Sequence, residues 1–99
     1  MGPSTTELKD ADLKELKDIR RLMVLDLTNT KVTDAGLKEV KELTQLTRLM
    51  LGDTKVTDTG LKELKDLKQL TTLYLRSTAV TNVGVKELQE ALPKCKISR

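Results

Sequence analysis

The chain lacks histidine, tryptophan and phenylalanine altogether, and it holds one tyrosine, Tyr74, and one cysteine, Cys95. Without histidine it has no side chain of the type that most often serves as a general base or a metal ligand. A single cysteine excludes an intrachain disulfide and a zinc site built from cysteines. These absences argue against a metal, a cofactor and an enzymatic active site, and they leave a core made mostly of leucine and valine.

The charge pattern argues against two further classes of partner. The 99 residues include 18 lysines and arginines and 15 aspartates and glutamates, with the two signs finely interspersed. A nucleic-acid module would more often show a basic stripe with aromatic residues for stacking. No apolar run approaches the length of a membrane span or of a signal-peptide core. We expect no nucleic-acid and no membrane partner, and the cytoplasm is the default expectation for a localisation that the sequence leaves unknown.

What the chain does contain is an internal repeat of 24 residues, marked by Leu22, Leu46 and Leu70. The middle unit reads LTRLMLGDTKVTDTGLKELKDLKQ, and its neighbours begin LMVLDLTNTKVTDAGLKEVKEL and LTTLYLRSTAVTNVGVKELQEA. A fixed period of this size is typical of a solenoid. Each unit then buries its apolar face only against the units beside it.

The first half of each unit has the alternation of a short strand. In the middle unit Leu49 and Leu51 point to one face, and Arg48 and Met50 point to the other. Period two over a short run indicates a strand with one buried face. A Gly-Asp pair then ends the run, as turn residues do.

The second half of each unit predicts a helix. In the middle unit Thr57 is the expected N-cap, with its hydroxyl accepting the backbone N–H of Gly60. Leu61, Leu64 and Leu67 follow at a spacing of three, which places them on one stripe of a helix. Each unit therefore consists of strand, loop, helix and loop.

Stacking such units predicts a single α/β solenoid domain over residues 1–99, a short arc with a parallel sheet on its concave face and helices on its convex face. The first helix lacks a preceding strand, and Asp10 or Asp12 is expected to cap it. In the last strand Ile97 should point inward, and Cys95 should be buried and inert unless that strand is loosely held. The parts are expected at residues 6–21 (half repeat), 22–45, 46–69 and 70–93 (repeats) and 94–99 (terminal strand).

The pattern L-x-x-L-x-L-x-x-T-x-V-T-D-x-G-L-x-x-L resembles the leucine-rich repeat family. It is most similar to the class with an (I/V)-T-D-x-G-L helix start, which includes cysteine-containing repeats of F-box-type adaptors and many bacterial tandem repeats. The resemblance implies an arc-shaped fold that binds proteins on its concave strand face. One departure is that Thr30, Thr54 and Thr78 stand where the family has Asn or Cys. A threonine hydroxyl can still bond the loop backbone.

The outward strand positions differ between repeats, whereas the inward positions do not. This contrast is expected of a scaffold with a varied face. Neighbouring parallel strands lie about 4.7–4.9 Å apart, so equivalent outward residues form ladders across the sheet. The expected ladders are Val24, Arg48, Thr72 and Lys96; Asp26, Met50, Tyr74 and Ser98; and Thr28, Gly52 and Arg76.

Five outward residues are the candidate partner-binding set: Asp26, Arg48, Met50, Tyr74 and Arg76. An exposed tyrosine beside a methionine and between two arginines has the composition of an interface hot spot. The alternative is that tyrosine is simply common in strands and covers its neighbours. The two arginines could hold a partner's carboxylate, or they could pair with Asp26 and with Asp53 in the loop.

Three functions remain open. The first is a non-enzymatic scaffold that binds a protein or peptide on the concave face. The second is a structural module that self-associates weakly through the open ends of the solenoid, where the strand near residues 23–27 has an uncovered edge, or a fragment of a longer array. The third, an enzyme, is disfavoured because Asp26 and Asp53 have no histidine partner and no glycine-rich phosphate loop.

Overall fold

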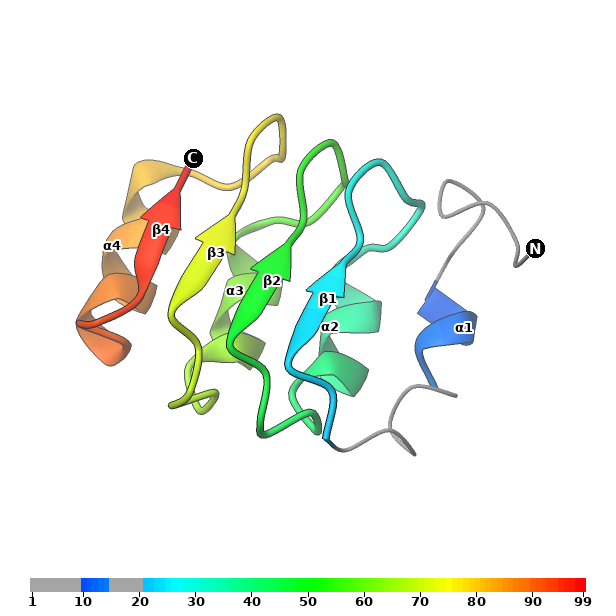
Figure 1. The fold of residues 1–99 in the computed structure, drawn as a ribbon. Coiled ribbons are helices and arrows are strands. Elements are labelled where there is room, and N and C mark those ends of the chain that lie inside the picture. Colours follow the sequence, from blue (N-terminus) through cyan, green and yellow to red (C-terminus); the bar gives the residue numbers. More distant parts are fainter. Residues whose placement is uncertain (1–9, 15–20) are drawn as a thin grey trace.

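The computed structural model describes residues 10–14 and 21–99. Most of the predicted half repeat at 6–21 lies outside these residues. Strands and helices alternate along the described chain (Figure 1). The elements are α1 (Asp10–Leu13), β1 (Val24–Asp26), α2 (Asp34–Val40), β2 (Arg48–Met50), α3 (Asp58–Leu61), the 3₁₀ turn η3 (Lys62–Leu64), β3 (Thr72–Tyr74), α4 (Asn82–Ala91) and β4 (Lys96–Ser98).

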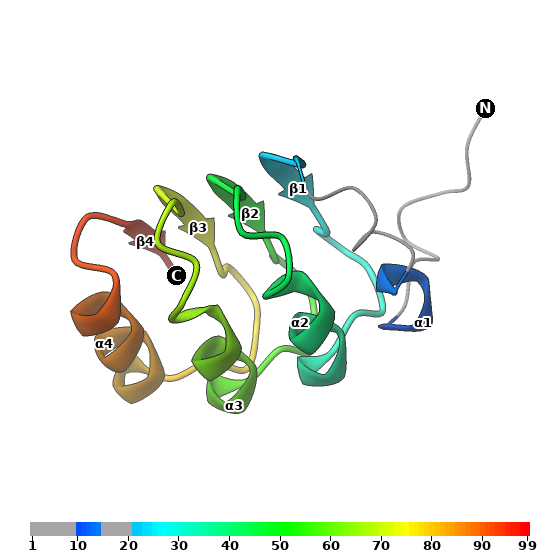
Figure 2. The same ribbon diagram turned by 90° about the horizontal axis from the view of Figure 1, so that it is seen from below.

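The four strands form one parallel sheet in the order β1-β2-β3-β4. Their register follows the repeat without a slip, so that Leu25 pairs with Leu49, Leu49 with Leu73, and Leu73 with Ile97. The helices form a second layer, and this row is longer than the row of strands (Figure 2). The sheet therefore lies on the inner side of the arc, and the predicted α/β solenoid is confirmed.

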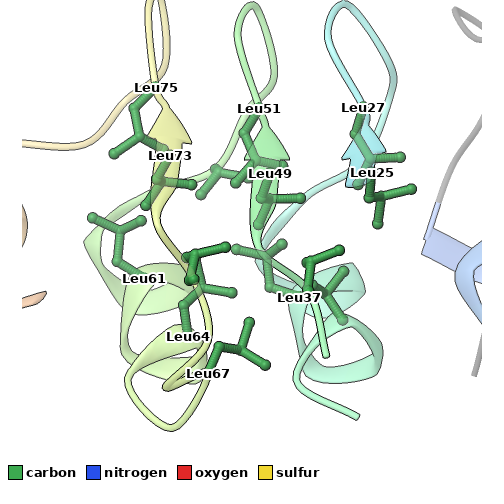
Figure 3. Close-up of a cluster of buried hydrophobic side chains, with 14 of the residues drawn as sticks. Leu25, Leu27, Leu37, Leu49, Leu51, Leu61, Leu64, Leu67, Leu73 and Leu75 are labelled. Atoms are coloured by element: carbon green, nitrogen blue, oxygen red, sulfur yellow. The ribbon is translucent and has the colours of Figure 1, made fainter. Parts of the chain in front are cut away.

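The core lies between the two layers and is mostly leucine, with four valines and Cys95. Leucines from the strands point toward leucines from the helices (Figure 3). Leu49 and Leu73, in the two central strands, are fully buried. Full burial of a leucine side chain stabilises the fold by about 1.5–3 kcal/mol, so the repeated leucines dominate the stability.

The helical half of the middle repeat is less regular than predicted. α3 makes a single turn before it tightens into η3, and Leu67 lies beyond both. All three predicted stripe residues, Leu61, Leu64 and Leu67, are nevertheless buried. The same spacing of three, at Leu37, Val40 and Leu43, accompanies the α-helix α2, so the spacing predicts the buried stripe but not where the helix changes from α to 3₁₀.

A carboxylate joins each repeat to the next. The side chain of Asp34, at the start of α2, accepts hydrogen bonds from the N–H (2.7 Å) and the hydroxyl (2.5 Å) of Thr57 in the following repeat. Asp10 does the same for Thr33, and Asp58 for Thr81. Asp10 thus bonds the next repeat, and capping of the first helix by Asp10 or Asp12 stays a prediction. We call each Asp–Thr pair an inter-repeat clamp.

The clamp also explains the glycine of T-D-x-G. A Cβ atom at Gly60 would clash with the carboxylate of Asp34 and press on Leu37. The threonine still caps its own helix, but the Thr57 hydroxyl accepts from the N–H of Thr59 at 3.2 Å and not from Gly60 as predicted. The predicted geometry occurs at α4, where Thr81 is the cap.

The loop after each strand is held by a threonine, as expected. The hydroxyls of Thr30, Thr54 and Thr78 each donate to the carbonyl of the leucine three residues before, all at 2.7 Å. This bond closes the loop that follows each strand, next to the ladder of Thr28, Gly52 and Arg76. It therefore fixes the position of the residues that border the concave face.

Candidate protein-binding face

The concave face displays the first two predicted ladders in the predicted register. Val24 lies opposite Arg48, then Thr72, then Lys96. Asp26 lies opposite Met50, then Tyr74, then Ser98. The buried leucine between the two outward residues of β1, β2 and β3 anchors each strand to the core. The outward side chains are thereby presented on a fixed frame.

Three of the five candidate residues line one hollow at the carboxyl ends of the strands. Met50, Tyr74 and Arg76 border an open hollow of about 460 Å³. Tyr74 forms part of its wall with 44% of its surface exposed, and Arg76 is exposed beside it. The rest of the lining comes from Thr28, Gly52, Asp53 and Ser77.

The other two candidates lie outside the lining of this hollow. Arg48 is exposed on β2, two residues before Met50. Asp26 is exposed on β1, and its carboxylate accepts the backbone N–H of Thr28 at 3.0 Å. Asp26 thus satisfies a backbone N–H at the end of its own strand. Its role in partner binding stays a prediction.

The arginines are not paired within the described chain. No ion pair there joins Arg48 or Arg76 to Asp26 or Asp53, and the recorded salt bridge, Lys41 to Glu63, lies elsewhere. Of the two alternatives, internal pairing with Asp26 and Asp53 is therefore the wrong one. The register sets Asp26 opposite Met50 and Arg48 opposite Val24, whereas Asp53 and Arg76 line the same hollow without an ion pair. Both guanidinium groups remain open to solvent.

Sequence reasoning missed a second hollow, of about 470 Å³, at the amino ends of the strands. It is lined by Met23, Thr44, Gln45, Thr47 and Gln69. The hydroxyl of Thr47 donates to the carbonyl of Met23 at 3.0 Å and fixes this border. The signal was present in the sequence, since Gln45 and Gln69 stand 24 residues apart and directly precede a buried leucine.

Cys95 is buried, as predicted. Burial raises the pKa of its thiol above 9.0, which keeps it protonated and unreactive near neutral pH. Among residues 10–14 and 21–99, no three His, Cys, Asp or Glu side chains are grouped so that they could hold a metal ion. Within the same residues, no helix has the length and apolar character needed to cross a membrane.

Comparison with known proteins agrees with this architecture. The sequence model of the family described as "Leucine Rich repeat" matches residues 20–40 and 42–65. No curated protein matches the chain. Among solved structures, one of Mex67:Mtr2 subunits from Chaetomium is similar, with a TM-score of 0.71 and 15% identity over 99% of this chain and 73% of that one.

Two bacterial structures are also similar. A leucine-rich-repeat protein of Leptospira interrogans has a TM-score of 0.58 and 26% identity, covering 79% of this chain and 25% of its own. An internalin, InlF, from Listeria monocytogenes has a TM-score of 0.61 and 19% identity, covering 88% of this chain and 31% of its own. This chain thus spans under a third of either bacterial protein. The family-model match and the Leptospira structure support a leucine-rich repeat family for the chain, and the other two structures support the fold.

Proposed function

We propose that this chain is a non-enzymatic interaction module that binds a protein or peptide on its concave strand face. The observation that carries the proposal is the hollow in which Met50, Tyr74 and Arg76 meet. Leucine-rich repeat domains generally mediate protein–protein interaction, and the Chaetomium match is itself a structure of Mex67:Mtr2 subunits. We also infer that the repeats are of the V-T-D-x-G-L class and form one domain over residues 1–99.

The physical basis of the proposal is a rigid frame with a partly exposed aromatic residue. Leu73 and Leu75, on either side of Tyr74 in sequence, are buried and hold its backbone in place. A partner that covers Tyr74 therefore gains contact area with little loss of conformational freedom. Aromatic and arginine side chains in such settings contribute a large share of binding energy.

The test compares proteins captured from source-cell extract by the wild type and by two variants. Tyr74→Ala removes the aromatic from the concave face, and Val83→Ala is the matched control, because Val83 is an exposed apolar residue on α4 in the helix layer. We expect a partner that wild type and Val83→Ala retain and Tyr74→Ala loses, with unchanged thermal midpoints. Partners lost equally from both variants, or from neither, would place binding elsewhere.

A second candidate function, weak self-association through β1, is favoured by a separate observation. The N–H of Leu27 donates to the carbonyl of Met50, so by alternation the N–H and C=O of Val24 face away from β2. No described residue pairs with them. Met23 and Val24 are also exposed apolar side chains at this edge. Unpaired edges of this kind accept added strands.

Sedimentation over a wide concentration range tests self-association. Val24→Pro removes the outward N–H without removing a bond to β2, and Val24→Thr keeps that N–H in a side chain of similar shape. We expect the wild type and Val24→Thr to associate at high concentration, and Val24→Pro to remain monomeric. A wild type that stays monomeric at millimolar concentration would contradict this function.

A further inference from the structure

We propose that the segment bound by the concave face is acidic, with carboxylate side chains flanking an apolar residue. This inference rests on the proposed function and adds the chemistry of the partner. It starts from the charges that the sheet presents. The outward positions of β2, β3 and β4 are Arg48, Met50, Thr72, Tyr74, Lys96 and Ser98.

This set contains two cations and no acid, and a third cation, Arg76, follows two residues after Tyr74. Arg48 and Lys96 lie on either side of Thr72 in one ladder. All three cationic side chains are exposed. Tyr74 therefore stands among positive charges just beyond its own strand and on both neighbouring strands.

The acidic groups near this face do not neutralise these cations. Asp26 lies on β1, two strands from Tyr74, and its carboxylate is bonded to the N–H of Thr28. Asp53 lines the hollow together with Arg76, but no ion pair joins them. The three cations thus outnumber the two acids, and an incoming carboxylate displaces no internal partner. Arginine suits this task because its planar group can bond both oxygens of a carboxylate.

Strand spacing sets the spacing of the acidic residues. Arg48 and Lys96 are two strands apart, which is about 9–10 Å between backbones. An extended peptide that crosses the sheet rises about 3.3 Å per residue and turns alternate side chains to the same face, so two carboxylates four positions apart, about 13 Å, can reach both cations through the long arginine and lysine side chains. The residue midway between them faces Thr72, beside Tyr74 and Met50 of the neighbouring ladder, and should be apolar. A single-stranded nucleic acid is also anionic, but one tyrosine offers it a single stacking site, whereas such binders use several.

The test is a selection of random peptides displayed on phage against the wild-type protein. Enriched peptides are then resynthesised and titrated against three variants. Arg48→Glu/Arg76→Glu reverses the concave charge, and Lys38→Glu/Lys86→Glu makes the same net change on exposed positions of α2 and α4. Tyr74→Ala reports whether binding uses the concave face at all.

We expect acidic sequences with an apolar residue between carboxylates to be enriched. The concave reversal should weaken them at least about tenfold, whereas the helix-layer reversal should change affinity by much less. Affinity should also fall as salt is raised. Neutral or basic peptides that still require Tyr74 would overturn the acidic assignment and leave the proposed function standing.

Two other outcomes also overturn the inference. If no enriched peptide depends on Tyr74, the concave site itself fails, and the proposed function fails with it. A ten-nucleotide oligouridine serves as a probe for the alternative polyanion. If that oligonucleotide binds more tightly than the best acidic peptide, the cations of the concave face would serve to bind nucleic acid and not an acidic peptide.

Discussion

The interior strands of the sheet and its two edge strands differ in how their backbone groups are hydrogen bonded and in how far their side chains are buried. A repeat with a following neighbour is bonded to it beyond the strands: the N–H of Asn29 donates to the carbonyl of Gly52, and that of Asp53 to the carbonyl of Arg76. Leu49 and Leu73, on the interior strands, are also wholly buried, whereas Leu25 on β1 retains 9% exposure and Ile97 on β4 is only half-buried. Burial and hydrogen bonding are both complete only where a neighbour exists on each side.

At the β4 edge, side chains that depart from the repeat supply hydrogen bonds that a further strand would have supplied, whereas Val24 at the β1 edge has no such partner within the described residues. On β4 the N–H of Lys96 faces β3, so the C=O of Cys95 faces away, and the side-chain amide of Gln89 donates to it at 2.8 Å. Gln89 stands where the middle repeat has Lys65. Arg99 donates to Asn82, which stands where Asp58 forms a clamp. A residue that differs from its equivalents in the other repeats can therefore have either of two roles. It can bind a partner, or it can complete the hydrogen bonding at an edge of the sheet.

The largest expected effect separates the interior from an edge through the core. Leu49→Ala should lower the free energy of unfolding by about 2–5 kcal/mol, because it empties a fully buried site. Ile97→Ala should lower it by less than about 2 kcal/mol, because the side chain is half-exposed and has a neighbouring strand on one side only. Urea unfolding monitored by circular dichroism measures both. Equal losses would show that burial does not differ between interior and edge as described.

The next prediction concerns the clamp, which joins interior repeats. Gly60→Ala should lower stability by about 1–3 kcal/mol, because the added Cβ displaces the carboxylate of Asp34 from Thr57. The control is Gly52→Ala, where the nearest atoms to a new Cβ are at 3.5 and 3.6 Å and the change should stay within about 0.5 kcal/mol. If both substitutions were tolerated alike, the clamp would not explain the glycine of the motif.

A smaller effect is expected where one side chain replaces a missing neighbour. Gln89→Ala should lower stability by about 1–2 kcal/mol, because it leaves the carbonyls of Leu92 and Cys95 without their side-chain donor. Lys65→Ala is the control in the preceding repeat, where the exposed side chain makes no hydrogen bond within the described residues, and it should change stability by less than about 0.5 kcal/mol. Matching losses would mean that Gln89 acts through packing and not as an edge cap.

The fold could be predicted because its main determinant is periodic. Inward leucines recurring at 24 residues fix which side of each strand is buried, and a one-residue slip would expose all of them. The clamp between Asp34 and Thr57 could not be predicted in this way. An aspartate in the first turn is explained equally well by the helix dipole, and nothing local shows that its partner lies 23 residues away.

The candidate site was predicted in part for the same reason. Register brought Met50 and Tyr74 side by side, and the loop geometry added Arg76 to the same hollow. Asp26 looked like a variable face residue because it breaks the repeat. Its bond to Thr28 favours a role as an edge residue, because no described strand lies beyond β1 on that side, and its role in partner binding stays a prediction.

A backbone prediction follows from comparing equivalent loops. Asn29, Asp53 and Ser77 all adopt left-handed backbone conformations, with φ of 59°, 57° and 58°. Asparagine and aspartate tolerate this region better than serine. Ser77→Asn should therefore raise stability by a few tenths to about 1 kcal/mol. Ser77→Val should lower it, and a thermal scan of both against wild type decides whether the left-handed φ is the reason.

The smallest effect is expected at the clamp nearest the β4 edge, and it depends on pH. Hydrogen bonds from the hydroxyl and then the N–H of Thr81 lower the pKa of Asp58 below its ordinary value of 3.8. A carboxyl group with a lowered pKa in the folded state stabilises that state when ionised. This contribution is present above the unfolded pKa and is lost as the pH falls through the folded one.

Asp58→Asn should therefore be less stable than wild type at neutral pH, and the difference should shrink steadily below about pH 4. Asp66→Asn removes an exposed carboxylate whose side chain makes no hydrogen bond within the described residues. Its difference from wild type should stay small at every pH. Urea unfolding from pH 7 to pH 2.5 measures both curves. A difference for Asp58→Asn that stayed constant on acidification would show that Thr81 does not favour the ionised form of Asp58, and that the clamp nearest β4 holds the last repeat by geometry alone.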